Sequence, residues 1–143
     1  MMIPKLVIVH CSDTPDYNIG EKHFDLFGAK EIDLWHKQRK FDRIGYHYVI
    51  RRTGVIEKGR EENEIGAHCK GYNESIGICY VGKCKPTQEQ IESLRKLYEE
   101  INLKYLFNIY NWYTHNTFNP GKTCPGFSLS ELRDILQDKR KEV

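Results

Sequence analysis

The sequence of 143 residues contains no long apolar run. Runs such as Leu6–Val9 fall far short of the roughly 20 residues that a membrane-spanning helix needs, so we expect no membrane span. Residues 1–5 carry a single lysine, and the apolar stretch after them is too short for the core of a secretory signal. We therefore expect synthesis in the cytoplasm without a signal peptide, and any action outside the cell then requires passage supplied by another factor.

A strong excess of one charge is also missing. The 22 basic and 20 acidic residues give a net charge of +2, whereas nucleic-acid-binding domains concentrate a marked basic excess. We therefore expect no nucleic-acid partner. The basic residues 139–141 are expected to form the solvated end of a last helix. Without repeats, low-complexity tracts or linkers, residues 1–143 suit one single domain.

The cysteines form no closely spaced, even-numbered framework of the kind that disulfide-rich domains show. Their count of five is odd, and in a reducing compartment they should be mostly thiols. At least one is then free for chemistry or for a metal. The five are Cys11, Cys69, Cys79, Cys84 and Cys124.

Short apolar strand patterns alternate with helical patterns along the chain. Thr53-Gly54 separates two strand patterns and predicts a hairpin. Thr87 with Gln90, and Ser128 with Glu131, have the spacing of capping boxes, so each pair predicts a helix start. The order indicates an α/β (α+β) fold, a single mixed β-sheet flanked by about three helices. Strands are expected at 5–10, 46–52, 55–58, 75–81 and 109–114, and helices at 30–40, after 87 and after 128.

Two histidines stand where predicted strands end, which is where functional sites of sheet proteins collect. These are His10 and His115, and Cys124 follows nine residues after His115, beyond the turn Asn119–Gly121. Two imidazoles and a thiolate suit zinc, and three protein ligands leave the fourth position for water, as in catalytic sites. The spacing alone leaves open the alternative of a buried cysteine and two unrelated histidines.

Four blocks of sequence carry a resemblance to a known family. They are "VIVHCSDTP" (7–15), "IGYHYVIRRTGVIEKGR" (44–60), "IGAHCKGYNESIGICYVG" (65–82) and "THNTFNPGKTCPGF" (114–127). Together and in this order they resemble phage-lysozyme-type N-acetylmuramoyl-L-alanine amidases, which share their fold with peptidoglycan recognition proteins. The resemblance covers nearly the whole chain.

The resemblance implies a zinc site and two catalytic residues. Its metal ligands match His10, His115 and Cys124, and its catalytic tyrosine and lysine match Tyr46 and Lys122. The implied activity is zinc-dependent hydrolysis of the amide between N-acetylmuramic acid and L-alanine of the peptidoglycan stem peptide. The implied setting is that of a bacteriolytic phage or prophage endolysin, which reaches the cell wall after release or through a holin.

Two other functions remain open beside this one. A non-catalytic module that binds peptidoglycan would share the groove, but it has no need of Cys124 or Lys122. Some phage members of the family also restrain their phage's RNA polymerase, so a regulatory role toward that partner is a second alternative.

Other residues of these blocks receive weaker assignments. His68 is expected to line the substrate groove, and His36 is expected to border it. Trp35 fits a buried helix face better than the groove. Alternation along a strand places His47 opposite Tyr46 and predicts a structural role for it.

Overall fold

Five strands form one mixed sheet in the computed structural model, which describes residues 1–138. Their order across the sheet is β3-β2-β4-β1-β5. Three of the four strand pairings are parallel, and only the hairpin partners β2 and β3 run antiparallel. The strands are β1 (Val7–Cys11), β2 (Tyr48–Ile50), β3 (Ile56–Lys58), β4 (Ile76–Tyr80) and β5 (Trp112–Thr114).

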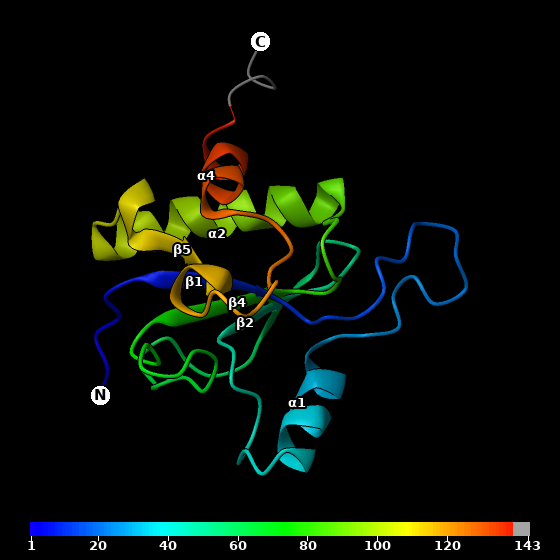
Figure 1. The fold of residues 1–143 in the computed structure, drawn as a ribbon, viewed down its shortest axis with the longest axis horizontal. Helices are drawn as coiled ribbons and strands as arrows, with labels where there is room; N and C mark the ends of the chain where they lie inside the picture. Colours follow the sequence, from blue (N-terminus) through cyan, green and yellow to red (C-terminus); the bar gives the residue numbers. More distant parts are fainter. Residues whose placement is uncertain (139–143) are drawn as a thin grey trace.

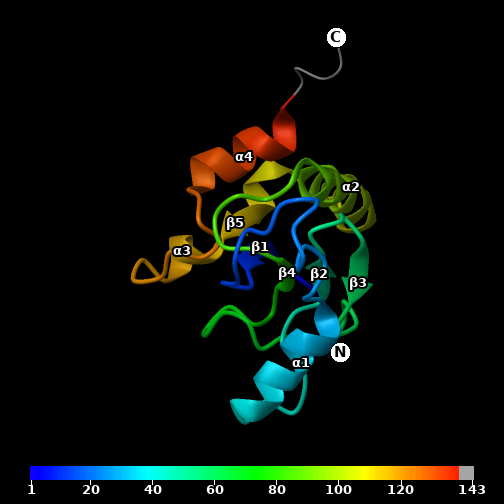
Figure 2. The same ribbon diagram turned by 90° about the vertical axis from the view of Figure 1, so that its right-hand side faces the viewer.

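Helices cover both faces of this sheet (Figure 1). α2 (Gln88–Tyr105) and α4 (Leu129–Gln137) lie together on one face, and α1 (Ala29–Gln38) lies on the other. The one-turn helix α3 (His115–Phe118) projects beyond the end of β5, as Figure 2 shows, and the 3-10 turn η1 (Ile109–Asn111) precedes that strand.

Side-chain alternation along β1 divides its residues between the two faces. Val7 and Val9 are fully buried and pack into the larger core, under α2 and α4. His10 therefore points to the opposite face, where a smaller core forms around Ile32 of α1 and Val49 of β2. The face of β1 that carries His10 is thus the face that α1 partly covers.

The register of the parallel strands brings distant residues to one edge. Val9 pairs with Thr114, and His10 pairs with Cys79. Because parallel strands end at the same edge of a sheet, the residue after β5, His115, lies beside the carboxyl end of β1. The topology alone places the two histidines next to one another.

Most of the expected elements are present. The expectation of a single mixed sheet with about three helices is confirmed, and α3 adds one short turn. Both predicted capping boxes form, at Thr87 with Gln90 and at Ser128 with Glu131. No helix within residues 1–138 is both long and apolar enough to cross a membrane. The basic segment 139–141, expected to end the last helix, lies outside the described residues.

The strand expected at 109–114 needs a correction. Its first half, Ile109–Asn111, is a 3-10 turn, and only Trp112–Thr114 joins the sheet. The side chain of Asn108 accepts a hydrogen bond from the Tyr110 N–H, which caps the turn locally. This side-chain cap offers the backbone a partner that strand pairing would otherwise supply.

Candidate metal centre

Three side chains with metal-binding atoms meet at the carboxyl ends of β1 and β5. One ring nitrogen of His10, one of His115 and the sulfur of Cys124 all lie within 4.8 Å of one another. The ring centroids of the two histidines are 4.5 Å apart. The fold therefore brings together three residues that stand up to 114 positions apart in the sequence (124 minus 10).

Each of the three side chains comes from a different local structure. His10 lies within β1 and is only 1% exposed, so the sheet fixes its backbone on both sides. His115 begins α3 directly after β5. Cys124 lies in the loop between α3 and α4, where hydrogen bonds must replace regular structure to fix its position.

The loop that carries Cys124 is held by such hydrogen bonds. The Asn116 N–H donates to the carbonyl of Cys124 over 2.9 Å, and the Asn116 side chain donates to the carbonyl of Phe127 over 3.0 Å. On the opposite side, the backbone N–H of Cys11 donates to the Cys124 sulfur over 3.1 Å. The sulfur is therefore fixed by β1, the same strand that carries His10.

The electrostatic state of the two histidines suits metal binding. Burial lowers the pKa of His10 well below its ordinary value, and the neighbouring His68 lowers it further. Burial and the charge of Lys122 lower the pKa of His115. Both rings are therefore neutral near pH 7, and each keeps one nitrogen lone pair.

One of these lone pairs has no protein partner. The Nδ1 atom of His115 is buried and makes no hydrogen bond within residues 1–138. A buried polar atom without a partner costs free energy, and a metal ion at this position would satisfy it. A hydrogen bond with Cys11 and burial raise the pKa of the Cys124 thiol, so its proton must leave when a metal binds. Two neutral imidazoles and one thiol fit a zinc ion.

A cleft of about 640 Å³ opens beside these side chains. His115 and Cys124 line it, whereas the buried His10 is not among its lining residues. Four other residues singled out from the sequence also line it: His36, Tyr46, His68 and Lys122. A substrate in this cleft would therefore contact the metal centre and the predicted catalytic pair together.

The phenol of Tyr46 lies between two of the histidines. Its ring centroid is 5.0 Å from that of His10 and 5.3 Å from that of His36. Burial raises the pKa of Tyr46 well above its ordinary value, so the hydroxyl stays protonated at neutral pH and can donate a hydrogen bond.

His36 presents a hydrogen-bond donor to the cleft. The backbone N–H of Gly45 donates to its Nδ1 over 2.9 Å, so a neutral ring carries its proton on Nε2. Burial, followed by the charges of Arg39 and Arg60, lowers the pKa of His36 and keeps the ring neutral. Its neighbour Trp35 packs against Phe27 at a centroid distance of 5.2 Å, as part of the smaller core.

Two further histidines, His68 and His47, are bound to protein groups. His68 contacts His10, with its Nδ1 2.9 Å from the Nε2 of His10, and burial lowers its pKa to about 3. His47 is fully buried; its Nδ1 accepts from the N–H of Gly77, and its Nε2 lies 2.7 Å from the carbonyl of Glu64. The contacts of His47 are those of a structural residue.

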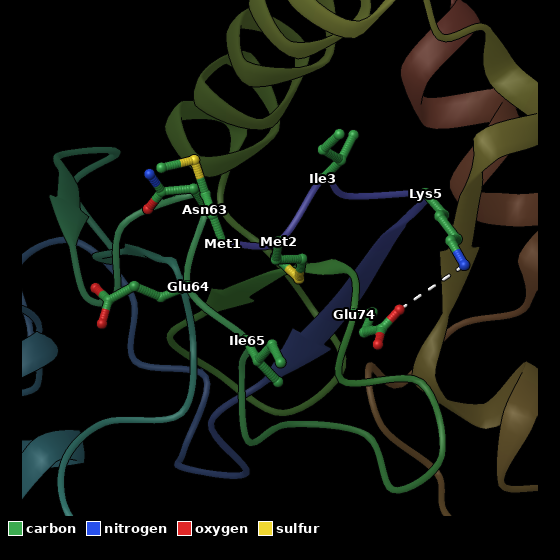
Figure 3. A pocket seen from close by; sticks show the side chains of 8 residues that line it. All are labelled: Met1, Met2, Ile3, Lys5, Asn63, Glu64, Ile65 and Glu74. Atoms are coloured by element: carbon green, nitrogen blue, oxygen red, sulfur yellow. Dashed lines mark ion pairs between the residues drawn. The ribbon is translucent and has the colours of Figure 1, made fainter.

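A second hollow, of about 710 Å³, lies at the N-terminus and is larger than the cleft (Figure 3). It is lined by Met1, Met2, Ile3 and Ile65, together with the exposed ion pair of Lys5 and Glu74. The histidines and Cys124 do not contribute to it. Because the one group of possible metal ligands found within residues 1–138 lies beside the smaller cleft, we assign the chemistry to that cleft.

Two asparagines that the sequence did not single out support the site. Asn116 ties the Cys124 loop to α3, and Asn73 accepts hydrogen bonds from the N–H groups of His68 and Cys69 over 2.8 and 2.9 Å. Asparagine side chains commonly bind backbone groups in turns, which is the one signal that could have indicated them.

Comparison with known proteins gives a consistent set of relatives. Residues 1–127 match the family model described as N-acetylmuramoyl-L-alanine amidase. The endolysin of Enterobacteria phage T3 is 38% identical over 133 residues, which cover 86% of this chain and 81% of that protein.

Solved structures share the fold. The endolysin amidase LysCS from Clostridium intestinale has a TM-score of 0.78 at 28% identity, covering 94% of this chain and 84% of that one. A tyrosine-to-phenylalanine mutant of Drosophila PGRP-LB, solved in complex with tracheal cytotoxin, has a TM-score of 0.77 at 25% identity, covering 92% of this chain and 81% of that one.

Proposed function

Because the chain belongs to the N-acetylmuramoyl-L-alanine amidase family and is a cell-wall amidase, we propose that it cleaves peptidoglycan between N-acetylmuramic acid and L-alanine with zinc as its cofactor. One observation carries the proposal: His10, His115 and Cys124 converge beside a cleft, where the buried Nδ1 of His115 has no partner within residues 1–138.

These three residues would hold the metal. When bound, zinc supplies a Lewis acid that activates water and polarises the scissile carbonyl. The protein contributes two neutral imidazoles, fixed by β1 and by the start of α3, and a cysteine fixed by its loop. Three protein ligands are typical of catalytic zinc sites, because the fourth position stays free.

Lys122 would stabilise the negative charge that develops on the carbonyl oxygen. Lys122 stands two residues before Cys124 in the sequence, and its side chain lines the cleft. Its positive charge lowers the pKa of His115. A positive charge of this kind is worth about 3–4 kcal/mol in a site that excludes water. Because its side chain is exposed in the free protein, it has room to adjust to the substrate.

Tyr46 and His36 would act as hydrogen-bond donors toward the substrate and the attacking water. The hydroxyl of Tyr46 stays protonated and lies beside His10, so it suits orientation of the water or transfer of its proton. His36 offers its Nε2–H at the cleft, where an amide carbonyl of the stem peptide would accept it.

We further propose that the protein is a phage or prophage endolysin, delivered to the wall by release or by a holin, because its relatives include endolysins of phages. A non-catalytic binding module is less favoured, since it has no use for Cys124 or Lys122 beside the histidines. A phage RNA polymerase as partner finds no support among the relatives.

The bond that is cut decides between these functions. Purified protein is incubated with peptidoglycan, and the soluble products are separated and identified by mass spectrometry. We expect stem peptides with a free amino group on L-alanine, released only when zinc is present. Products cut within the peptide or between sugars, or intact peptidoglycan bound without release of any fragment, would contradict the proposal.

A further inference from the structure

A series of hydrogen-bonding groups runs from the main chain at Ser75, directly before β4, to the candidate ligand His10. The Nε2 of His10 lies 2.9 Å from the Nδ1 of His68, and the Nε2 of His68 lies 3.1 Å from the carbonyl oxygen of Ser75. The rings of the two histidines are nearly perpendicular, at 87°. His68 is 9% exposed, and both of its ring nitrogens are taken by protein atoms.

The carbonyl of Ser75, at one end of this series, determines which ring nitrogen of each histidine carries the proton. A backbone carbonyl only accepts hydrogen bonds, so the Nε2 of His68 must carry the proton that faces Ser75. The Ser75 hydroxyl lies 3.4 Å from the same nitrogen and donates its own proton to the carbonyl of Tyr72, so it too acts as an acceptor toward His68.

The protonation of His10 follows from this assignment. Because the neutral His68 ring has its proton on Nε2, its Nδ1 is an acceptor, and the Nε2 of His10 must donate to it. A neutral His10 ring then has no proton on Nδ1. The Nδ1 lone pair of His10 is therefore the one left to join His115 and Cys124 at the metal.

Two glycines leave the space that the ring of His68 occupies. A Cβ atom added at Gly77 would stand 2.6 Å from the ring of His68, and one added at Gly66 would stand 2.5 Å from it. Neither glycine has a positive φ angle, so both are explained by the space that the ring occupies. Asn73 holds the main chain of His68 through the residue's N–H.

We propose that His68 is a positioning residue that fixes the Nε2-protonated tautomer of His10, presenting its Nδ1 to zinc, and that it is not a substrate contact. The proposal rests on the zinc site of the proposed function. Partners of this kind orient metal-binding histidines and raise their basicity, and their loss typically weakens metal binding roughly 10- to 100-fold.

The tautomer of His10 is measured on the unaltered, zinc-free protein. Long-range ¹H–¹⁵N NMR spectra distinguish a ring protonated on Nε2 from one protonated on Nδ1. We expect His10 and His68 both to carry their proton on Nε2 near pH 7. A proton on the Nδ1 of His10 would overturn the proposal, whether or not the protein cleaves peptidoglycan.

Zinc affinity is then compared in variants, by competition with a coloured chelator. His68→Leu removes both nitrogens and should raise the zinc dissociation constant roughly 10- to 100-fold. His68→Asn keeps an acceptor near the Nδ1 position and should recover most of that loss. Zinc binding as tight as in the native protein for a folded His68→Leu variant would contradict the proposal, as would an Asn variant no better than the Leu variant.

His47→Leu is the matched control, because His47 is also buried but its ring nitrogens bond to Gly77 and Glu64 and not to His10. It should lower the free energy of unfolding and leave the zinc dissociation constant unchanged. If it weakens zinc binding as much as His68→Leu does, the effect is one of general stability and the proposal is wrong. A native protein that binds no zinc at all would instead overturn the proposed function.

Discussion

Replacing Asn116 by alanine should loosen the loop that carries Cys124. The substitution removes two well-formed side-chain hydrogen bonds, one donated to the carbonyl of Phe127 over 3.0 Å and one accepted from the hydroxyl of Thr114 over 2.5 Å. A longer contact to the carbonyl of Thr123, at 3.5 Å, is lost with them. The fold itself should survive, because domains of this size have about 5–15 kcal/mol of stability.

The size of the effect follows from these bonds. Each well-formed hydrogen bond contributes about 0.5–1.5 kcal/mol, so Asn116→Ala should lower the free energy of unfolding by about 1–3 kcal/mol. If the same bonds hold Cys124 ready for zinc, zinc affinity falls by at most that free energy. Since each 1.4 kcal/mol is a factor of ten, the dissociation constant should rise, by no more than about 5- to 150-fold.

Urea unfolding of the zinc-free protein gives the first quantity, and titration against a chelating indicator gives the second. Asn119→Ala is the control, since Asn119 is an exposed residue of the same loop. It should change neither value appreciably. A folded Asn116→Ala variant that loses the expected stability and yet binds zinc as tightly as the native chain would refute the idea that this loop prepares the metal site.

Two further predictions concern catalysis and pH. Lys122→Ala should lower turnover by about 10²- to 10³-fold in peptide-release assays while zinc stays bound, and loss of zinc would show that its role was assigned wrongly. Burial favours the neutral form of Glu62, but hydrogen bonds from Tyr105, Tyr48 and Lys104 together lower its pKa. Its contribution to stability is therefore complete above the unfolded-state pKa of about 4.3 and is lost as the pH falls through the lower folded-state pKa. Glu62→Gln should flatten the acid side of the stability curve, and an unchanged curve would contradict this assignment.

Much of the fold was accessible from local patterns. The helix starts at Thr87 and Ser128 could be predicted, because each capping box depends only on two residues three positions apart. The prediction of a strand at 109–111 is wrong. The apolar pattern there favours a strand, but the Asn108 side chain binds the backbone and stabilises a 3-10 turn instead. Propensity over so few residues does not decide between the two structures.

The site was only partly accessible, for a physical reason. The sequence spacing of His10, His115 and Cys124 is compatible with a metal site but does not require one. The three side chains come together because β1 pairs with β5, and this pairing joins segments that are far apart in the sequence. The family resemblance supplied what the spacing could not. The link between His68 and His10 joins residues 58 positions apart, so only the folded structure reveals it.

The most direct test of the central claim is to measure zinc content and peptide release in the same samples. Native protein, protein stripped with a chelator, stripped protein given back one equivalent of zinc, and Cys124→Ala are compared on purified peptidoglycan. We predict one zinc per chain in the native and restored samples, release of stem peptides in those two alone, and weak zinc binding without release for Cys124→Ala. Equal release by the stripped protein, or full activity of Cys124→Ala, would contradict a zinc site formed by His10, His115 and Cys124.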